Sequence, residues 1–95
     1  MFVIDLKYKK PLSEVEVFTA AHRAWLDEQY RRGTLICSGP KVPRSGGVLI
    51  ACVADAAAAT HLISQDPFYL HEIAEYSITE FQATKAIAQL HEFMA

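Results

Sequence analysis

The chain has 95 residues, 52 % of them hydrophobic, and a formal net charge of −2 at pH 7. This length predicts one domain with a packed core, and the composition excludes a disordered chain. The basic residues are dispersed, so we expect no nucleic acid partner. No stretch approaches the roughly 20 apolar residues of a membrane span, and no signal-peptide pattern follows Met1. We therefore expect a cytoplasmic protein without a membrane partner.

The predicted elements alternate between strands and helices. Residues 2–8 alternate apolar and polar side chains, as in a half-buried strand, whereas residues 48–53 form the continuous apolar run of a central strand. In chain order, we predict a strand at 2–8, a helix at 13–32, strands at 34–38 and 48–53 joined by a turn-rich segment at 41–47, a helix at 56–65, a short helix from 67, a strand at 76–81 and a C-terminal helix at 84–94.

The helix predicted at 13–32 has boundary signals at both ends. Ser13 and Glu16 have the spacing of an N-terminal capping box, and Gly33 suits the left-handed residue that follows a helix. His22 lies on the face that the i, i+3, i+4 spacing predicts to be buried. An imidazole there is either a core histidine with a hydrogen-bond partner or an acid/base group.

Two carboxylates are candidate partners for His22. Asp66 precedes Pro67 and is expected to cap the short helix, a structural role that requires no catalysis. A helix N-terminus favours the charged form of a carboxylate, so Asp66 would orient an imidazole well and act poorly as a general acid. Asp5 is the alternative, because the first strand packs against the helix that carries His22. The spacing alone does not decide between the two.

Other side chains indicate a pocket less specifically. Ser38, at the end of the second strand, is a candidate for binding a substrate oxygen, although such a serine is more often structural. Four aromatic residues could line a pocket or fill the core: Trp25, Tyr8, Phe68 and Tyr69. Both interpretations stay open at this point.

The histidines and cysteines do not indicate a metal site. Cys37 and Cys52 lack the spacing of a zinc site, and we expect two free thiols. His61, His71 and His91 are too far apart to suggest a cluster. We therefore expect no metal.

The order β-α-β-β-α-β with a terminal helix predicts an α+β, ferredoxin-like plait. In this fold a four-stranded antiparallel sheet carries both main helices on one face. The other face would stay uncovered in a single chain. We therefore expect a homodimer formed sheet to sheet, and the high apolar content of so short a chain also favours a homo-oligomer. A higher oligomer through residues 84–95 stays open.

These motifs together resemble the YCII-related family of the dimeric ferredoxin-like α/β barrel superfamily. The resemblance is carried by His22-Arg23-Ala24-Trp25-Leu26, Arg32-Gly33, Ser38-Gly39-Pro40 and Asp66-Pro67-Phe68. It predicts one domain over residues 1–82 and leaves 83–95 as a C-terminal helical extension. It also implies the ferredoxin-like fold, the sheet-to-sheet dimer and a pocket centred on His22 and Asp66.

The resemblance implies a small enzyme that needs no cofactor. Relatives include dehydrochlorinases of hydroxyquinol-type aromatics and muconolactone isomerases, so we predict an elimination or isomerisation of a small cyclic or aromatic metabolite. His22 would move the proton with Asp66 orienting its ring, and Ser38, Trp25 and Phe68 would bind the substrate. Two alternatives stay open: a non-catalytic module that binds a small molecule or a partner, and a hydrolase with Ser38 as its nucleophile.

Overall fold

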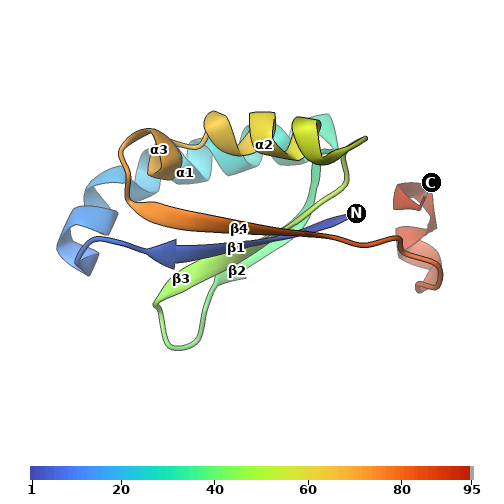
Figure 1. The fold of residues 1–95 in the computed structure, drawn as a ribbon, viewed down its shortest axis with the longest axis horizontal. Helices are drawn as coiled ribbons and strands as arrows, with labels where there is room; N and C mark the ends of the chain where they lie inside the picture. The colour runs from blue at the N-terminus through green and yellow to red at the C-terminus, as the bar shows by residue number, and fades with distance from the viewer. Residues whose placement is uncertain (95) are drawn as a thin grey trace.

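The computed structural model describes residues 1–94 and has the predicted α+β ferredoxin-like fold. One antiparallel sheet runs in the order β2-β3-β1-β4, and three helices lie together on one of its faces (Figure 1). The strands are β1 (Phe2–Tyr8), β2 (Leu35–Pro40), β3 (Gly46–Ala51) and β4 (Ala74–Glu80), and the helices are α1 (Leu12–Arg32), α2 (Ala56–Ser64) and α3 (Pro67–Leu70).

The side chains of the central strand β1 alternate between the two faces of the sheet. Phe2, Ile4 and Leu6 point toward the helices and are at most 2 % exposed, so they form the centre of the core. The side chains between them, Asp5 among these, point to the opposite face because successive residues of a strand alternate. No α-helix of residues 1–94 covers that opposite face (Figure 1).

Helix α1 ends as predicted but begins differently. Gly33 has a φ of 74°, and its N–H bonds back to the last turn of the helix. At the other end the helix begins at Leu12, directly after Pro11, and no side chain caps it, so the predicted Ser13–Glu16 capping box is wrong. The Pro11 carbonyl already accepts the first helical hydrogen bonds. Ser13 therefore lies inside the first turn, where its hydroxyl cannot act as the cap.

Helices α2 and α3 begin at the predicted aspartates. The Asp55 carboxylate accepts the Ala58 N–H at 2.8 Å, and the Asp66 carboxylate accepts the Phe68 N–H at 2.9 Å. Pro67 occupies the first turn of α3, where its missing N–H costs nothing. Helix α3 contacts both α2 and β4.

The C-terminal helix is present and shorter than predicted. It is a 3-10 helix, η1 (Ala88–Phe93), which lies beyond one end of the sheet (Figure 1). The Cys52 thiol donates to the Phe93 carbonyl at 3.1 Å and links this helix to the residue that follows β3. None of the helices in residues 1–94 is long and apolar enough to cross a membrane.

Candidate functional site

His22 and Asp66 are far apart in the sequence and meet in the fold. His22 lies in the middle of α1, and Asp66 directly precedes α3, which packs against α1. His22 Nδ1 lies 2.7 Å from Asp66 Oδ1. The Asp66 side chain is fully buried and that of His22 is 12 % exposed. Of the two candidate carboxylates, Asp66 therefore makes the contact.

Asp5 is the wrong partner. Its carboxylate lies on the face of the sheet opposite α1, where it pairs with Lys41 Nζ at 3.0 Å. Other side chains of β1 share one core cluster with residues of α1, but alternation along the strand turns Asp5 away from the helix.

Asp66 accepts hydrogen bonds from three directions. Its Oδ1 accepts the Phe68 N–H as well as the His22 contact, and its Oδ2 accepts the Tyr76 hydroxyl from β4 at 2.5 Å. An ionised carboxylate can only accept hydrogen bonds, so all three donors suit its charged form. His22 then carries its proton on Nδ1. The lone pair that a general base needs is left on Nε2.

Tyr76 is a member of this network that the sequence analysis missed. It stands opposite Leu6 in the register of β1 and β4, so it faces the helices. Burial raises the pKa of Tyr76 far above its ordinary value of 10.0, and the charge of Asp66 and the hydrogen bond to it raise the pKa further. The phenol is therefore a neutral donor at physiological pH. Alternation along β4 could have placed Tyr76 on the inner face, but no spacing links it to Asp66.

Aromatic contacts hold the plane of the imidazole. The His22 ring stacks on the Phe68 ring with centroids 4.0 Å apart and an angle of 4° between the planes. The Trp25 ring lies 5.9 Å away and is tilted by 30°. Together with the hydrogen bond at Nδ1, the stacking determines both the plane and the rotation of the ring.

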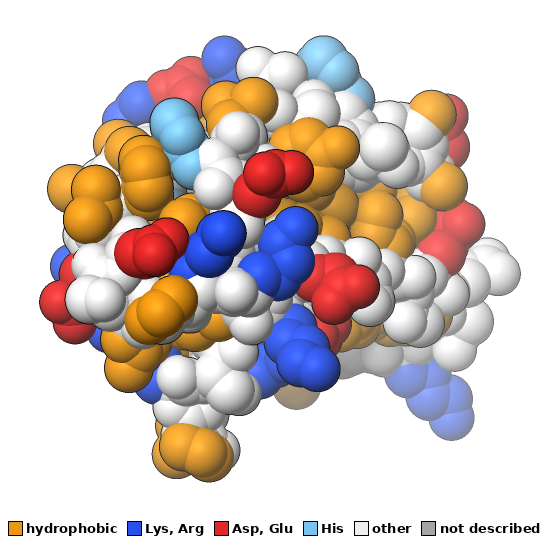
Figure 2. Space-filling view, turned by 60° about the vertical axis from the view of Figure 1, so that its left-hand side comes forward, with side chains coloured by type: hydrophobic (Ala, Val, Ile, Leu, Met, Phe, Trp, Pro, Cys, Tyr) orange, Lys and Arg blue, Asp and Glu red, His pale blue; other side chains and the backbone are white. Residues whose placement is uncertain are grey.

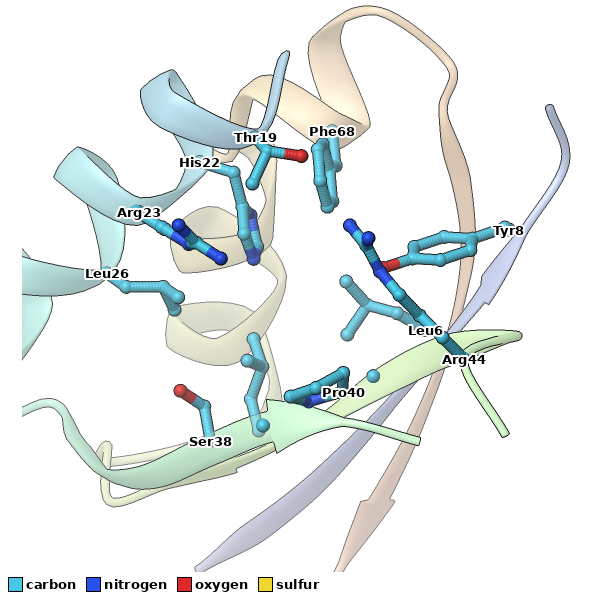
Figure 3. Close-up of a pocket in the computed structure, with 13 residues that line it drawn as sticks. Leu6, Tyr8, Thr19, His22, Arg23, Leu26, Ser38, Pro40, Arg44 and Phe68 are labelled. Atoms are coloured by element: carbon cyan, nitrogen blue, oxygen red, sulfur yellow. The ribbon is translucent and has the colours of Figure 1, made fainter. Parts of the chain in front are cut away.

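A cavity of about 130 Å³ opens beside the imidazole. Figure 3 shows His22 pointing into it from α1, Phe68 bordering it from α3, and Ser38 on β2 across from them. A cavity of roughly 150 Å³ in another protein accommodates benzene, so this space suits a single ring. The residues that line it are Leu6, Tyr8, Thr19, His22, Arg23, Leu26, Ser38, Gly39, Pro40, Arg44, Gly47, Leu49 and Phe68.

The three predicted substrate-binding residues divide between the cavity and the core. Ser38 and Phe68 line the cavity, and the Ser38 hydroxyl is hydrogen-bonded to that of Tyr30. Trp25 is absent from the cavity wall: its ring is buried, and its Nε1 has no hydrogen-bond partner within residues 1–94. Trp25 lies three residues after His22, which carries it one turn along α1 and into the core. We therefore interpret it as a core residue.

Two arginines at the cavity also escaped the sequence analysis. Arg23 is part of the motif that carries the family resemblance, but its spacing from other residues indicates no functional role. Arg44 belongs to the turn-rich connection between β2 and β3, and it lines the cavity together with Gly39 and Pro40 from the end of β2. Neither position had a signal in the sequence pattern.

The remaining histidines and cysteines do not line the cavity. His71 stacks on Phe18 with centroids 4.1 Å apart, and Cys37 and Cys52 are free thiols. Within residues 1–94, no group of three His, Cys, Asp or Glu side chains is placed to hold a metal ion.

Comparison with known proteins agrees with the motifs. The model of the YCII-related domain matches residues 1–82. The chain belongs to the YCII-related family. Its fold is similar to that of 5-chloro-2-hydroxyhydroquinone dehydrochlorinase from Burkholderia phenoliruptrix, solved in complex with 2,5-dihydroxybenzoquinone. The TM-score is 0.71 and the sequence identity 17 %, and the match covers 85 % of this chain and 93 % of that one. No curated protein gives a significant match. At this identity the structural match shows a shared fold.

Proposed function

We propose that this protein is a small enzyme that moves a proton on a single-ring substrate, in an elimination such as dehydrochlorination or in an isomerisation. The observation that carries the proposal is the hydrogen bond between His22 and the fully buried Asp66 at the wall of a ring-sized cavity. The similar fold of a dehydrochlorinase supports the choice of reaction.

His22 is the proposed proton carrier. Its Nε2 takes a proton from a carbon or hydroxyl of the ring, and the electron pair left behind forms a new double bond. In an elimination, chloride or another leaving group departs from the ring with its bonding electrons; in an isomerisation, the proton returns to a different carbon. Asp66 stabilises the imidazolium in the meantime. A positioned base of this kind contributes roughly 10²–10⁴-fold, and holding the ring in place supplies the remainder.

Ser38 and Phe68 are the proposed substrate-binding residues. Phe68 offers an apolar wall beside the imidazole. The Ser38 hydroxyl uses one hydrogen bond with Tyr30, so it keeps capacity for a ring oxygen. Because that hydroxyl bonds to Tyr30 and not to His22, the geometry favours substrate binding over the nucleophile of a hydrolase.

The test compares His22→Gln with the wild type. Wild-type protein is incubated with 5-chloro-2-hydroxyhydroquinone and with other halogenated or hydroxylated single rings, and mass spectrometry and released chloride report turnover. For a compound that is turned over, His22→Gln should lower kcat by roughly 10²–10⁴-fold. His71→Gln is the matched control, since its ring also stacks on a phenylalanine but lies outside the cavity. A folded His22→Gln variant with wild-type turnover would contradict the proposal, and rings that bind unchanged would favour a non-catalytic module.

We also propose that the protein is a homodimer formed through the face of the sheet away from the helices. Val3, Val48 and Ile50 lie on that face and are partly exposed. A charge among them should oppose association, so Ile50→Lys is expected to halve the mass in light scattering without changing the circular dichroism spectrum. Val17→Lys is the control, because Val17 is an exposed β-branched residue on α1. A wild-type monomer at micromolar concentration would overturn this proposal.

A further inference from the structure

The proposed proton transfer does not involve the two arginines that line the cavity. We propose that the substrate is a single-ring anion, and that Arg23 and Arg44 hold its carboxylate or ionised ring hydroxyl while His22 acts on the ring. This inference rests on the proposed function in one respect, namely that the cavity is the substrate site. It adds the charge of the substrate and two residues that select for it.

The two guanidinium groups reach the cavity from different elements. Arg23 follows His22 on α1, and Arg44 belongs to the connection between β2 and β3. Figure 3 shows their side chains on opposite sides of the cavity, with His22 between them. A substituent at the mouth of the cavity would therefore lie between two positive charges, while the ring behind it stays beside the imidazole.

These positive charges are poorly compensated. No Asp or Glu lines the cavity within residues 1–94, and the charge of Asp66 lies behind His22, where three donors already use it. Arg23 forms no ion pair in the described part of the chain. The ion pair of Arg44 is loose, 3.9 Å from Glu16, whose side chain is 66 % exposed, and its Cζ lies 6.0 Å from the centroid of the Tyr8 ring. Exposed pairs of this kind are weak, so both arginines are available to an anion.

The surface beside the cavity is also basic. A shallow depression adjoins it and shares Tyr8 and Arg44 with its wall; its other charged lining residues are Lys7, Lys10 and Lys41. Lys41 is partly neutralised by Asp5 at 3.0 Å. Figure 2 shows Lys and Arg side chains gathered in the middle of this end of the molecule, with acidic side chains around them. Such a local field attracts anions even though the net charge of the protein is −2.

The inner wall of the cavity selects a ring over an inorganic anion. Leu6, Leu49 and Phe68 are buried apolar side chains that border the cavity. They offer nothing to a fully hydrated ion, whereas they can cover the faces of an aromatic or unsaturated ring. The combination of an apolar interior and a cationic mouth therefore matches a ring that carries one negative group.

Matched neutral and anionic probes test the proposal. Benzoate and benzamide differ in charge and little in shape; 4-nitrophenolate, at a pH at which it is ionised, and nitrobenzene form the corresponding pair for a ring hydroxyl. Affinities are measured by calorimetry and by chemical-shift changes in the amide spectrum of the full chain. In the wild type, at least one anion should bind about tenfold more tightly than its neutral partner. The preferred anion identifies the substituent.

The arginine variants localise the effect. Arg23→Gln and Arg44→Gln should each weaken binding of the preferred anion about fivefold and leave the neutral probe unchanged. Arg31→Gln is the control, because it removes the same charge from an exposed position of α1, where Arg31 pairs with Glu28. An equal loss in the control would show that net charge alone is responsible and would overturn the proposal.

The outcomes separate this inference from the proposed reaction. His22→Gln should retain the preference for the anion, since the arginines supply it. If His22→Gln also retained turnover, the proposed reaction would be contradicted, while the proposed anion site would still be supported. Equal affinities within both probe pairs, or no spectral change with any probe at its highest soluble concentration, would overturn the anion site whatever the result with His22.

Discussion

Asp55 and Asp66 occupy the same local position in two successive helices, and they differ in what surrounds them. Asp55 precedes α2 on the surface, and its carboxylate accepts the Ala58 N–H. Asp66 precedes α3 and also caps its helix, through the N–H of Phe68, two residues on rather than three. Only Asp66 is fully buried, and only Asp66 meets donors from distant parts of the chain.

The comparison shows how a helix cap becomes part of a site. A cap uses one of the several acceptor positions of a carboxylate. At Asp55 the others face water, whereas at Asp66 His22 and Tyr76 occupy them. A charge removed from water depends on such partners, since an unpaired buried polar group is costly. The same residue type at the same helix position should therefore respond very differently to substitution.

The largest expected effect is that of Asp66→Asn, compared with the same replacement at Asp55. Asparagine caps helices about as well as aspartate, so Asp55→Asn should change the free energy of unfolding by less than about 0.5 kcal/mol. Asp66→Asn turns one acceptor into an amide donor that faces His22 or Tyr76, and should cost about 1–3 kcal/mol. Turnover should fall about 10²-fold or more, because the His22 tautomer is no longer held. Urea unfolding measures the free energy of unfolding, and product formation measures turnover. Equal losses in Asp55→Asn and Asp66→Asn would contradict the distinction between the two aspartates.

Removing the third donor, Tyr76, is expected to cost a similar amount of stability and to have a smaller effect on turnover. Tyr76→Phe leaves Asp66 Oδ2 without its partner and should cost about 1–3 kcal/mol of unfolding free energy. Tyr69→Phe is the control, because Tyr69 is half exposed and touches Tyr76 edge to face; its cost should stay under about 0.5 kcal/mol. As a positioning residue, Tyr76 should affect kcat more than KM. A loss of stability with kcat unchanged would make its role purely structural.

The smallest expected effect, confined to pH above 10.0, is the pH dependence that the buried Tyr76 adds to the free energy of unfolding. Because the pKa of Tyr76 is raised above 10.0 in the folded protein by burial and by Asp66, the unfolded chain loses this proton first. The stabilisation is therefore complete below pH 10.0 and declines as the pH rises above it, by at most about 1.4 kcal/mol per pH unit. Urea unfolding across this range should show a steeper decline in the wild type than in Tyr76→Phe. Parallel curves for the two proteins would contradict a buried hydrogen bond from Tyr76 to Asp66.

The sequence could predict most of the fold because its patterns are local. Alternation along residues 2–8 placed Phe2, Ile4 and Leu6 in the core, and Gly33 marked the end of α1. The predicted start of α1 was wrong because the helix begins one residue earlier, at Leu12, with the Pro11 carbonyl accepting its first hydrogen bonds and no side-chain cap. The terminal helix was predicted too long, since apolar spacing indicates a helical face without stating how many turns form.

The amino-acid sequence by itself determined the order of the elements, the placement of His22 on the inner face of α1 and the capping position of Asp66. Only the tertiary structure decided that Asp66 and not Asp5 meets His22, that Tyr76 joins them, and that Trp25 stays in the core. Periodicity determines the face on which a side chain lies, but the packing of helices on the sheet determines which distant residues share that face.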